Sequence, residues 1–328
     1  MAIYIINEIF LLLGGIAVFM LGLKMLGSGV KISPGGRVGK LIGRCSGNSV
    51  LCFFAGAGVT AIAQSSVAVN VIAVGLVESG VMSFYGAAGV VMGANVGTTV
   101  TAQIISVSGS SSFNVTAIGS LLAFGGIIAS SFDNKKVGAA GRLALGLGLI
   151  FIGIEIMSAS VERFKGFLWF RNIFMMSNPL LLVLNGILVT GIVQSSSAVT
   201  GMMIVLAGNG LIGFESAMFL ILGSNIGSCF PVIIASMKKG EAARRTAFFN
   251  LFFNLFGTLI FFPFLLLFGE GFSSAFTSGR SVERCIADFH TLFNVVISII
   301  TLPLLKPFTK LVSAAVYDKR APVYASKL

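Results

Sequence analysis

The chain has 328 residues, of which 56% are hydrophobic and 10% charged, whereas a soluble domain carries about 25% charged residues. This composition excludes an ordinary soluble domain and predicts an all-α polytopic protein of the cell membrane, surrounded by lipid. The net charge of +11 does not indicate nucleic-acid binding, because most Lys and Arg residues lie in short connections between apolar runs.

Nine apolar runs follow one another along the chain. Two of them, 50–78 and 178–208, carry a polar cluster near the middle, and we expect them to fold as re-entrant hairpins with the cluster at the tip. The others are predicted to be transmembrane helices, since about 20 apolar residues cross the hydrocarbon core. These seven runs lie near 5–30, 84–107, 113–132, 139–161, 214–237, 246–268 and 285–305.

The first apolar run contains a charged residue, Lys24. It occupies the position equivalent to Glu155 in the second half of the chain, and a charge within a membrane helix is by default a functional hypothesis. Two interpretations stay open. The two residues form a pair that joins the halves, or each has a structural role, as a snorkelling side chain or in an ion pair.

The polar cluster of the second run recurs about 130 residues later. "TAIAQSSVAV" from Thr60 aligns with "TGIVQSSSAV" from Thr190, and "GANVGTT" from Gly93 aligns with "GSNIGSC" from Gly223 at the same spacing. Two polar signatures at one spacing indicate a duplicated unit. We therefore divide the chain into a first repeat (1–134), a second repeat (135–268) and a final transmembrane helix with a cytoplasmic tail (269–328).

The duplication predicts the topology of the two repeats. If the hairpins do not cross, each repeat crosses the membrane three times, and the second repeat is inverted relative to the first. Basic residues gather in the loops that this arrangement places inside, whereas the predicted outer loops hold few. That bias is typical of cytoplasmic loops. The inner loops are 31–44, 135–142, 238–245 and 306–327, and the outer loops are 163–171 and 280–284.

The polar clusters cannot face lipid, because an unpaired hydroxyl or amide in hydrocarbon costs roughly 2–7 kcal/mol. One interpretation is helix packing, in which Ser and Thr bond to their own helix and GxxxG glycines allow close approach. The other is a binding site near the membrane midplane, where the repeats meet and helices are broken. The G-x-N-x-G segments would break a helix, since glycine tolerates an unwound backbone. The recurrence of both signatures favours the binding site.

None of the four polar windows, 60–70, 93–101, 190–201 and 223–230, contains Lys, Arg, Asp or Glu. An anion bound there would find no fixed cationic partner, and an isolated ion is costly in a low dielectric. Hydroxyl and amide oxygens suit Na⁺, whereas hydroxyls and amide N–H groups suit an oxyanion. A site that holds the anion only when cations are present defines a coupled symporter.

These motifs resemble those of the type II sodium-dependent phosphate cotransporter family. The paired QSS(S) segments carry the resemblance, together with "AFFNLFFNLFG" (247–257) and "ADFHTLFNV" (287–295). It implies symport of inorganic phosphate by alternating access, with Na⁺ as coupling ion and no other metal or cofactor. The implied phosphate-binding residues are Gln64, Ser65, Ser66, Gln194, Ser195, Ser196, Ser197, Asn95 and Asn225. The implied sodium-binding residues are Gln64, Ser65, Gln194, Ser195, Thr98, Thr99, Thr200 and Ser228.

Two positions depart from the pattern of that family. Val67 stands in the first cluster where the second cluster has a third serine. Gly80 stands where electrogenic animal members carry an Asp, with Glu78 two residues earlier. These departures predict fewer coupled sodium ions and little net movement of charge.

An enzyme is not expected, and no catalytic residue is assigned, because the chain holds no HExxH, no G-x-S-x-G and no Cys–His arrangement. A symporter of another oxyanion, such as sulfate or a carboxylate, and an anion channel stay open, as does assembly into a homodimer. His290, the one histidine, follows Asp288 and precedes Asn294 by one helical turn. Both a proton-linked and a structural role stay open for it.

Overall fold

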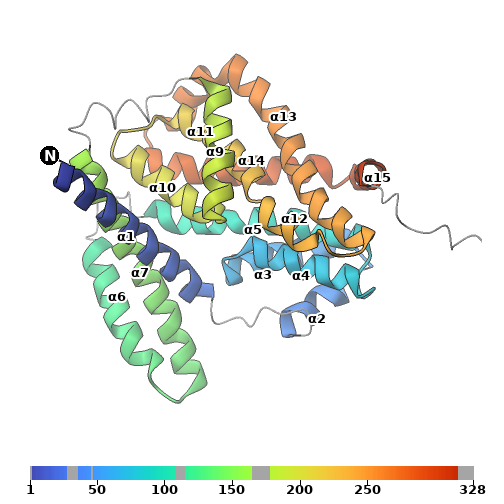
Figure 1. The fold of residues 1–328 in the computed structure, drawn as a ribbon, viewed down its shortest axis with the longest axis horizontal. Helices are drawn as coiled ribbons and strands as arrows, with labels where there is room; N and C mark the ends of the chain where they lie inside the picture. The colour runs from blue at the N-terminus through green and yellow to red at the C-terminus, as the bar shows by residue number, and fades with distance from the viewer. Residues whose placement is uncertain (1, 28–35, 46, 108–114, 165–177, 317–328) are drawn as a thin grey trace, which may run out of the picture.

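The computed structural model describes residues 2–27, 36–45, 47–107, 115–164 and 178–316, and all regular structure in these ranges is helical (Figure 1). The predicted all-α fold is therefore confirmed. Most of the predicted tail lies outside the described residues. The helices are α1 (Ala2–Gly27), α2 (Arg37–Arg44), α3 (Ser49–Ala63), α4 (Ser66–Glu78), α5 (Phe84–Ser106), α6 (Val115–Ser130), α7 (Lys135–Phe164), α9 (Pro179–Val193), α10 (Ser196–Gly208), α11 (Phe214–Gly227), α12 (Phe230–Ser236), α13 (Glu241–Thr277), α14 (Val282–Thr301) and α15 (Leu305–Ala315).

Several helical stretches are long and apolar enough to cross a membrane, which confirms a multi-pass membrane protein. The run predicted near 113–132 is α6, whose 16 residues make it shorter than each of the six stretches that are long enough to span. The inversion of the second repeat and the re-entrant placement of the hairpins remain predictions. The six spans in the described part of the chain are Ile5–Gly27, Phe84–Ser106, Lys135–Arg163, Phe214–Ser236, Glu241–Thr277 and Val282–Thr301.

The helices form two groups that meet at α10. In one group, α7 packs against both α1 and α6, and these three helices lie together at the left of Figure 1. In the other, α3 packs along α5 and α9 along α11, while α13 and α14 contact both α5 and α11. Helix α10 contacts α1 and α7 as well as α9, α11 and α14. Aromatic rings fill the centre of the second group, where the Phe261 and Phe293 rings meet edge to face at 5.0 Å.

Glycines set the spacing of the two tightest hairpin contacts. A Cβ atom on Gly93 of α5 would lie 1.9 Å from the Phe53 carbonyl oxygen of α3. A Cβ atom on Gly223 of α11 would lie 2.0 Å from the Val183 carbonyl oxygen of α9. No side chain fits at these distances, so both positions require glycine for close backbone approach. The helix-packing interpretation of these glycines therefore describes them correctly.

The predicted helix breaks differ between the two repeats. The prediction for GANVGTT is wrong, because α5 continues through it from Phe84 to Ser106. In the second repeat α11 ends at Gly227 and α12 begins at Phe230, so the helix is interrupted at the last two residues of GSNIGSC. Pro231 explains the difference, since proline lacks the N–H that a continuous helix needs. The equivalent residue of the first repeat is Thr101, which continues the helix.

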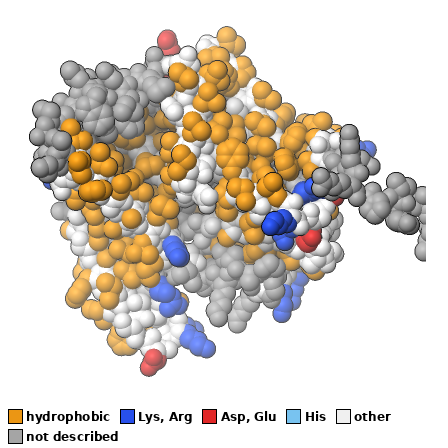
Figure 2. Space-filling view, viewed as in Figure 1, with side chains coloured by type: hydrophobic (Ala, Val, Ile, Leu, Met, Phe, Trp, Pro, Cys, Tyr) orange, Lys and Arg blue, Asp and Glu red, His pale blue; other side chains and the backbone are white. Residues whose placement is uncertain are grey.

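Basic side chains gather on one part of the surface. Figure 2 shows Lys and Arg along the lower and right parts of this face, whereas the upper part is mainly hydrophobic. The turn between α6 and α7, helix α2 and the start of α13 lie in those lower and right parts (Figure 1). These segments belong to the loops predicted to be inside, and their orientation in the membrane remains a prediction.

We predict that Gly93→Ala destabilises the protein by about 1–3 kcal/mol, because the added methyl group must push α3 away from α5. The melting temperature of the detergent-purified protein measures this loss. Gly58→Ala is the matched control, since Gly58 lies on α3 and a Cβ atom there would meet nothing within 4 Å. Equal melting temperatures for the two variants would contradict the packing role of Gly93.

Candidate functional site

Both QSS segments form the same turn between two helices. Gln64 follows α3 with φ 54°, and Gln194 follows α9 with φ 57°. In the described part of the chain these are the residues other than glycine that have a positive φ. The left-handed conformation costs a residue with a Cβ atom roughly 1–2 kcal/mol. Such strain at two equivalent positions points to a functional constraint on the turns.

The serine after each glutamine caps the next helix. The Ser65 hydroxyl accepts a hydrogen bond from the Ala68 N–H at 3.3 Å, and the Ser195 hydroxyl accepts one from the Ala198 N–H at 3.2 Å. The first N–H groups of a helix have no partner within the helix and carry a partial positive charge. Each turn therefore brings the carboxyl end of one helix and the amino end of the next to the same place.

The two turns meet at one cavity of about 400 Å³. Helices α3 and α9 end at this cavity, and α4 and α10 begin there. All residues of both QSS(S) clusters line it, together with one face of α1. The lining residues are Met20, Leu23, Lys24, Gly27, Ala63, Gln64, Ser65, Ser66, Val67, Gln194, Ser195, Ser196 and Ser197. The duplicated polar segments are thus adjacent in space, although they lie far apart in sequence.

The two glutamines have different surroundings. Helix α5 holds the Gln64 side chain: the Thr101 hydroxyl of α5 donates a hydrogen bond of 2.7 Å to Oε1 of Gln64. Gln194 is exposed, and Pro231 occupies the position equivalent to Thr101. Val67 faces the cavity in one turn, where Ser197 does in the other. The cavity therefore has two unequal halves.

Six of the predicted binding residues are not among those that line this cavity. All six are buried. Hydroxyls of three of them bond to carbonyl oxygens of their own helices, as expected for helix-packing residues. The six are Asn95, Thr98, Thr99, Thr200, Asn225 and Ser228.

Asn95 belongs instead to a buried amide network. Its Nδ2 donates to Oδ1 of Asn250 at 2.9 Å, and its Oδ1 accepts from Nδ2 of Asn254 at 3.4 Å. Asn254 also donates to the Cys229 sulfur at 3.4 Å, beside the break between α11 and α12. Both α13 asparagines come from the NLFFNLFG segment, and sequence reasoning assigned them no role. The network joins the two repeats through α5 and α13.

The prediction that a bound anion meets no fixed cation covered only the four polar windows and left out Lys24 of α1, which also lines the cavity. Each polar window is neutral by itself, but α1 brings a charge from another part of the chain. Of the two interpretations left open for Lys24 and Glu155, the pair is not formed among the described residues. Glu155 instead accepts a hydrogen bond of 3.0 Å from the Thr116 hydroxyl. The signal in the sequence was a lysine in a largely apolar helix.

His290 lies away from the cavity. It is buried on α14, with 2% of its surface exposed. Its neighbour Asp288 forms ion pairs with Arg280 and Arg284 and accepts a hydrogen bond from Gln103. His290 therefore makes no contact with the candidate site.

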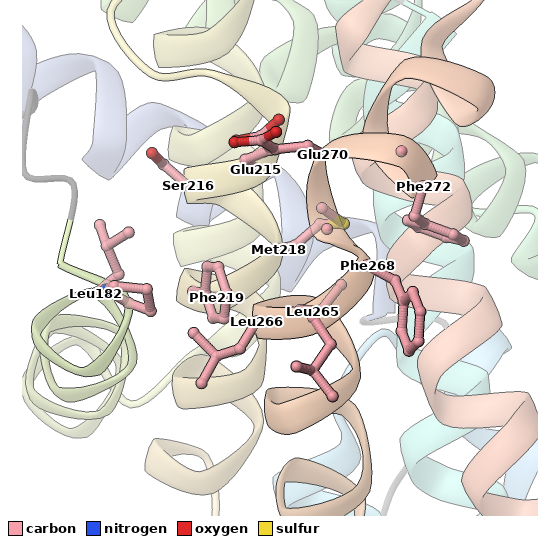
Figure 3. Close-up of a pocket in the computed structure, with 14 residues that line it drawn as sticks. Leu182, Glu215, Ser216, Met218, Phe219, Leu265, Leu266, Phe268, Glu270 and Phe272 are labelled. Carbon is pink, nitrogen blue, oxygen red and sulfur yellow. The ribbon is translucent and has the colours of Figure 1, made fainter.

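A larger cavity, of about 790 Å³, lies between α9, α11 and α13 (Figure 3). Figure 3 shows the side chains of Glu215 and Glu270 at the same end of this cavity. No Lys or Arg is among its lining residues, so the two carboxylates would repel an anion. The chemistry of an oxyanion site fits the smaller cavity.

A multi-pass helical chain with a polar cavity between paired helix turns defines a membrane transport protein. The sequence model of the "Na+/Pi-cotransporter" family matches residues 18–159 and 163–274. The chain therefore belongs to this family of phosphate transporters, and the resemblance inferred from the QSS motifs is confirmed. Members of the family are transporters and not enzymes, as the sequence predicted.

Bacterial and animal proteins are similar to this chain. An uncharacterized protein of Bacillus subtilis, YqeW, is 31% identical over 300 residues, which cover 90% of this chain and 94% of YqeW. The Escherichia coli protein named "Putative inorganic phosphate export protein YjbB" is 30% identical over 94% of this chain and 56% of its own length. Human "Sodium-dependent phosphate transport protein 2B" is 34% identical over 38% of this chain and 20% of its own length. No solved structure matches the chain.

We predict that Thr101→Val weakens phosphate transport, because Gln64, which lines the cavity, loses the hydrogen bond that joins its side chain to α5. Losing one hydrogen bond of about 0.5–1.5 kcal/mol corresponds to a rise of roughly two- to tenfold in the half-saturating phosphate concentration. Uptake of radiolabelled phosphate into proteoliposomes measures this change. Ser106→Ala is the control on the same helix, because the Ser106 hydroxyl bonds to the Gln103 carbonyl oxygen of its own helix and Ser106 is not among the residues that line the cavity. A similar effect of both variants would contradict the role of Thr101.

Proposed function

We propose that this chain is a sodium-coupled symporter of inorganic phosphate, and that phosphate and Na⁺ share the cavity between the two QSS turns. The observation that carries the proposal is the meeting of both QSS(S) clusters at one cavity, with two helices ending and two helices beginning there. The family, whose name includes both ions, supports the choice of substrate and coupling ion.

The helix ends suit ions of opposite charge. The amino ends of α4 and α10, with their serine hydroxyls, offer N–H and O–H donors to the phosphate oxygens. The carboxyl ends of α3 and α9, with the glutamine carbonyls, offer oxygen ligands to Na⁺. Cation and anion bound in one cavity stabilise each other, so each raises the affinity for the other by the same factor. This reciprocal effect is the physical basis of coupling.

Alternating access around this cavity follows from the predicted inverted repeats, residues 1–134 and 135–268. The two turns come from different repeats, so a movement of one repeat against the other would open the cavity to one side of the membrane and then to the other. The direction of transport is then set by the combined gradients of the two ions. Export, which the name of the E. coli relative states for that protein, and uptake are two directions of one mechanism.

We predict that proteoliposomes containing this protein take up phosphate with saturation, and that an imposed sodium gradient drives the uptake. Gln64→Ala and Gln194→Ala should each reduce the uptake at least tenfold, since each removes polar ligands from the cavity. Gln103→Ala is the control, because this third glutamine bonds to Asp288 and Thr291 and does not line the cavity.

The same assay separates the alternatives. A flux that does not saturate would indicate an anion channel. Stronger displacement of radiolabelled phosphate by unlabelled sulfate or a carboxylate than by unlabelled phosphate would assign another oxyanion. Phosphate uptake by the unmodified protein that is the same with and without a sodium gradient would contradict the proposed coupling.

A further inference from the structure

We propose that Lys24 contacts the transported phosphate and supplies a fixed positive charge that replaces one sodium ion in loading the site. This inference rests on the proposed function. Lys24 is the one ionisable residue among those that line the cavity between the QSS turns. A bound phosphate would therefore meet a protein cation there in addition to the helix ends and hydroxyls.

Lys24 forms no ion pair with Glu8, the other charged residue of α1. Glu8 is buried near the opposite end of the helix, where Arg163 of α7 approaches it at 3.0 Å. Sixteen residues separate Glu8 from Lys24, which at 1.5 Å per residue is about 24 Å along the helix. None of the ion pairs found among the described residues includes Lys24.

The backbone around Lys24 is fixed on both sides by glycine contacts. A Cβ atom on Gly22 would lie 2.6 Å from the Ile150 N of α7. A Cβ atom on Gly27, one turn after Lys24, would lie 2.2 Å from the carbonyl oxygen of Ala63, the last residue of α3. The end of α1 therefore rests directly against the first QSS turn. The Lys24 side chain is exposed and lines the cavity beside this turn.

Electroneutrality connects this position to coupling. A divalent phosphate in a neutral cavity needs two sodium ions to balance its charge, whereas Lys24 leaves one charge to be balanced. The ammonium group also has three donors for phosphate oxygens. Lys24 therefore accounts in physical terms for the smaller number of sodium ions that the sequence predicts.

The test compares Lys24→Met with Lys24→Arg. Equilibrium binding of radiolabelled phosphate to the detergent-purified protein should weaken about tenfold in Lys24→Met at low sodium. High sodium should restore most of this loss, because a further Na⁺ takes the place of the ammonium group, and the dependence on sodium should become steeper. Lys24→Arg should keep the binding and the sodium dependence of the unmodified protein. Lys40→Met is the control for loss of a lysine, since Lys40 lies on α2 outside the cavity lining.

Distinct results would overturn the inference. Unchanged binding in Lys24→Met, or a loss that high sodium does not restore, would show that the charge does not act on phosphate. If Lys24 binds a lipid headgroup instead, Lys24→Met would impair transport only in proteoliposomes that contain anionic lipid. Impaired transport by Lys24→Met that disappears in phosphatidylcholine vesicles would therefore also contradict the proposal. The unmodified protein and Gln64→Ala can behave as proposed while Lys24→Met binds phosphate like the unmodified protein. In that case the inference about Lys24 is wrong and the proposed function stands.

Discussion

The structure depends on one constraint: the unpaired N–H and C=O groups at helix ends need hydrogen-bond partners, and the membrane around the chain offers little water. Each QSS turn leaves the last carbonyls of one helix and the first N–H groups of the next without partners inside the helices. Serine hydroxyls satisfy part of this need at Ser65 and Ser195. The polar cavity between the turns accommodates the rest. Because hydrocarbon offers no hydrogen bonds, such turns persist only where protein, water or a ligand meets them.

Close glycine packing makes each turn part of a rigid unit. Helix α3 lies against α5 and α9 against α11 at distances that exclude any side chain at Gly93 and Gly223. The turns at the ends of α3 and α9 are therefore held by long neighbouring helices and not by a flexible loop. Residues held by such packed elements have a well-defined geometry. Helix α1 belongs to another group, with α6 and α7, and reaches the same cavity.

The two QSS turns are similar, and a few residues around them make the two sides of the cavity unequal. Thr101 of the continuous helix α5 donates a hydrogen bond to Gln64. At the equivalent position of the other half, Pro231 accompanies the break between α11 and α12. Val67 lines the cavity opposite the additional hydroxyl of Ser197. Unequal halves suit a site for two ions of opposite charge, because the same ligand set cannot favour both. Lys24, contributed by one repeat alone, adds to this inequality.

The sequence by itself determined the local features. Apolar runs of sufficient length specify helices, and the QSS pattern specifies the capped turns. The spacing of the two patterns predicts a duplication, and the motifs themselves indicate the family. Even the unequal helix break can be read from Pro231, although the glycine-rich segments suggested two breaks. Only the tertiary structure decided that both turns meet, that Lys24 joins them, and that Asn95 turns away into a network with α13. Capping and helix length arise from neighbours in sequence, whereas a cavity is formed by side chains from distant helices, whose contacts depend on how the whole bundle packs.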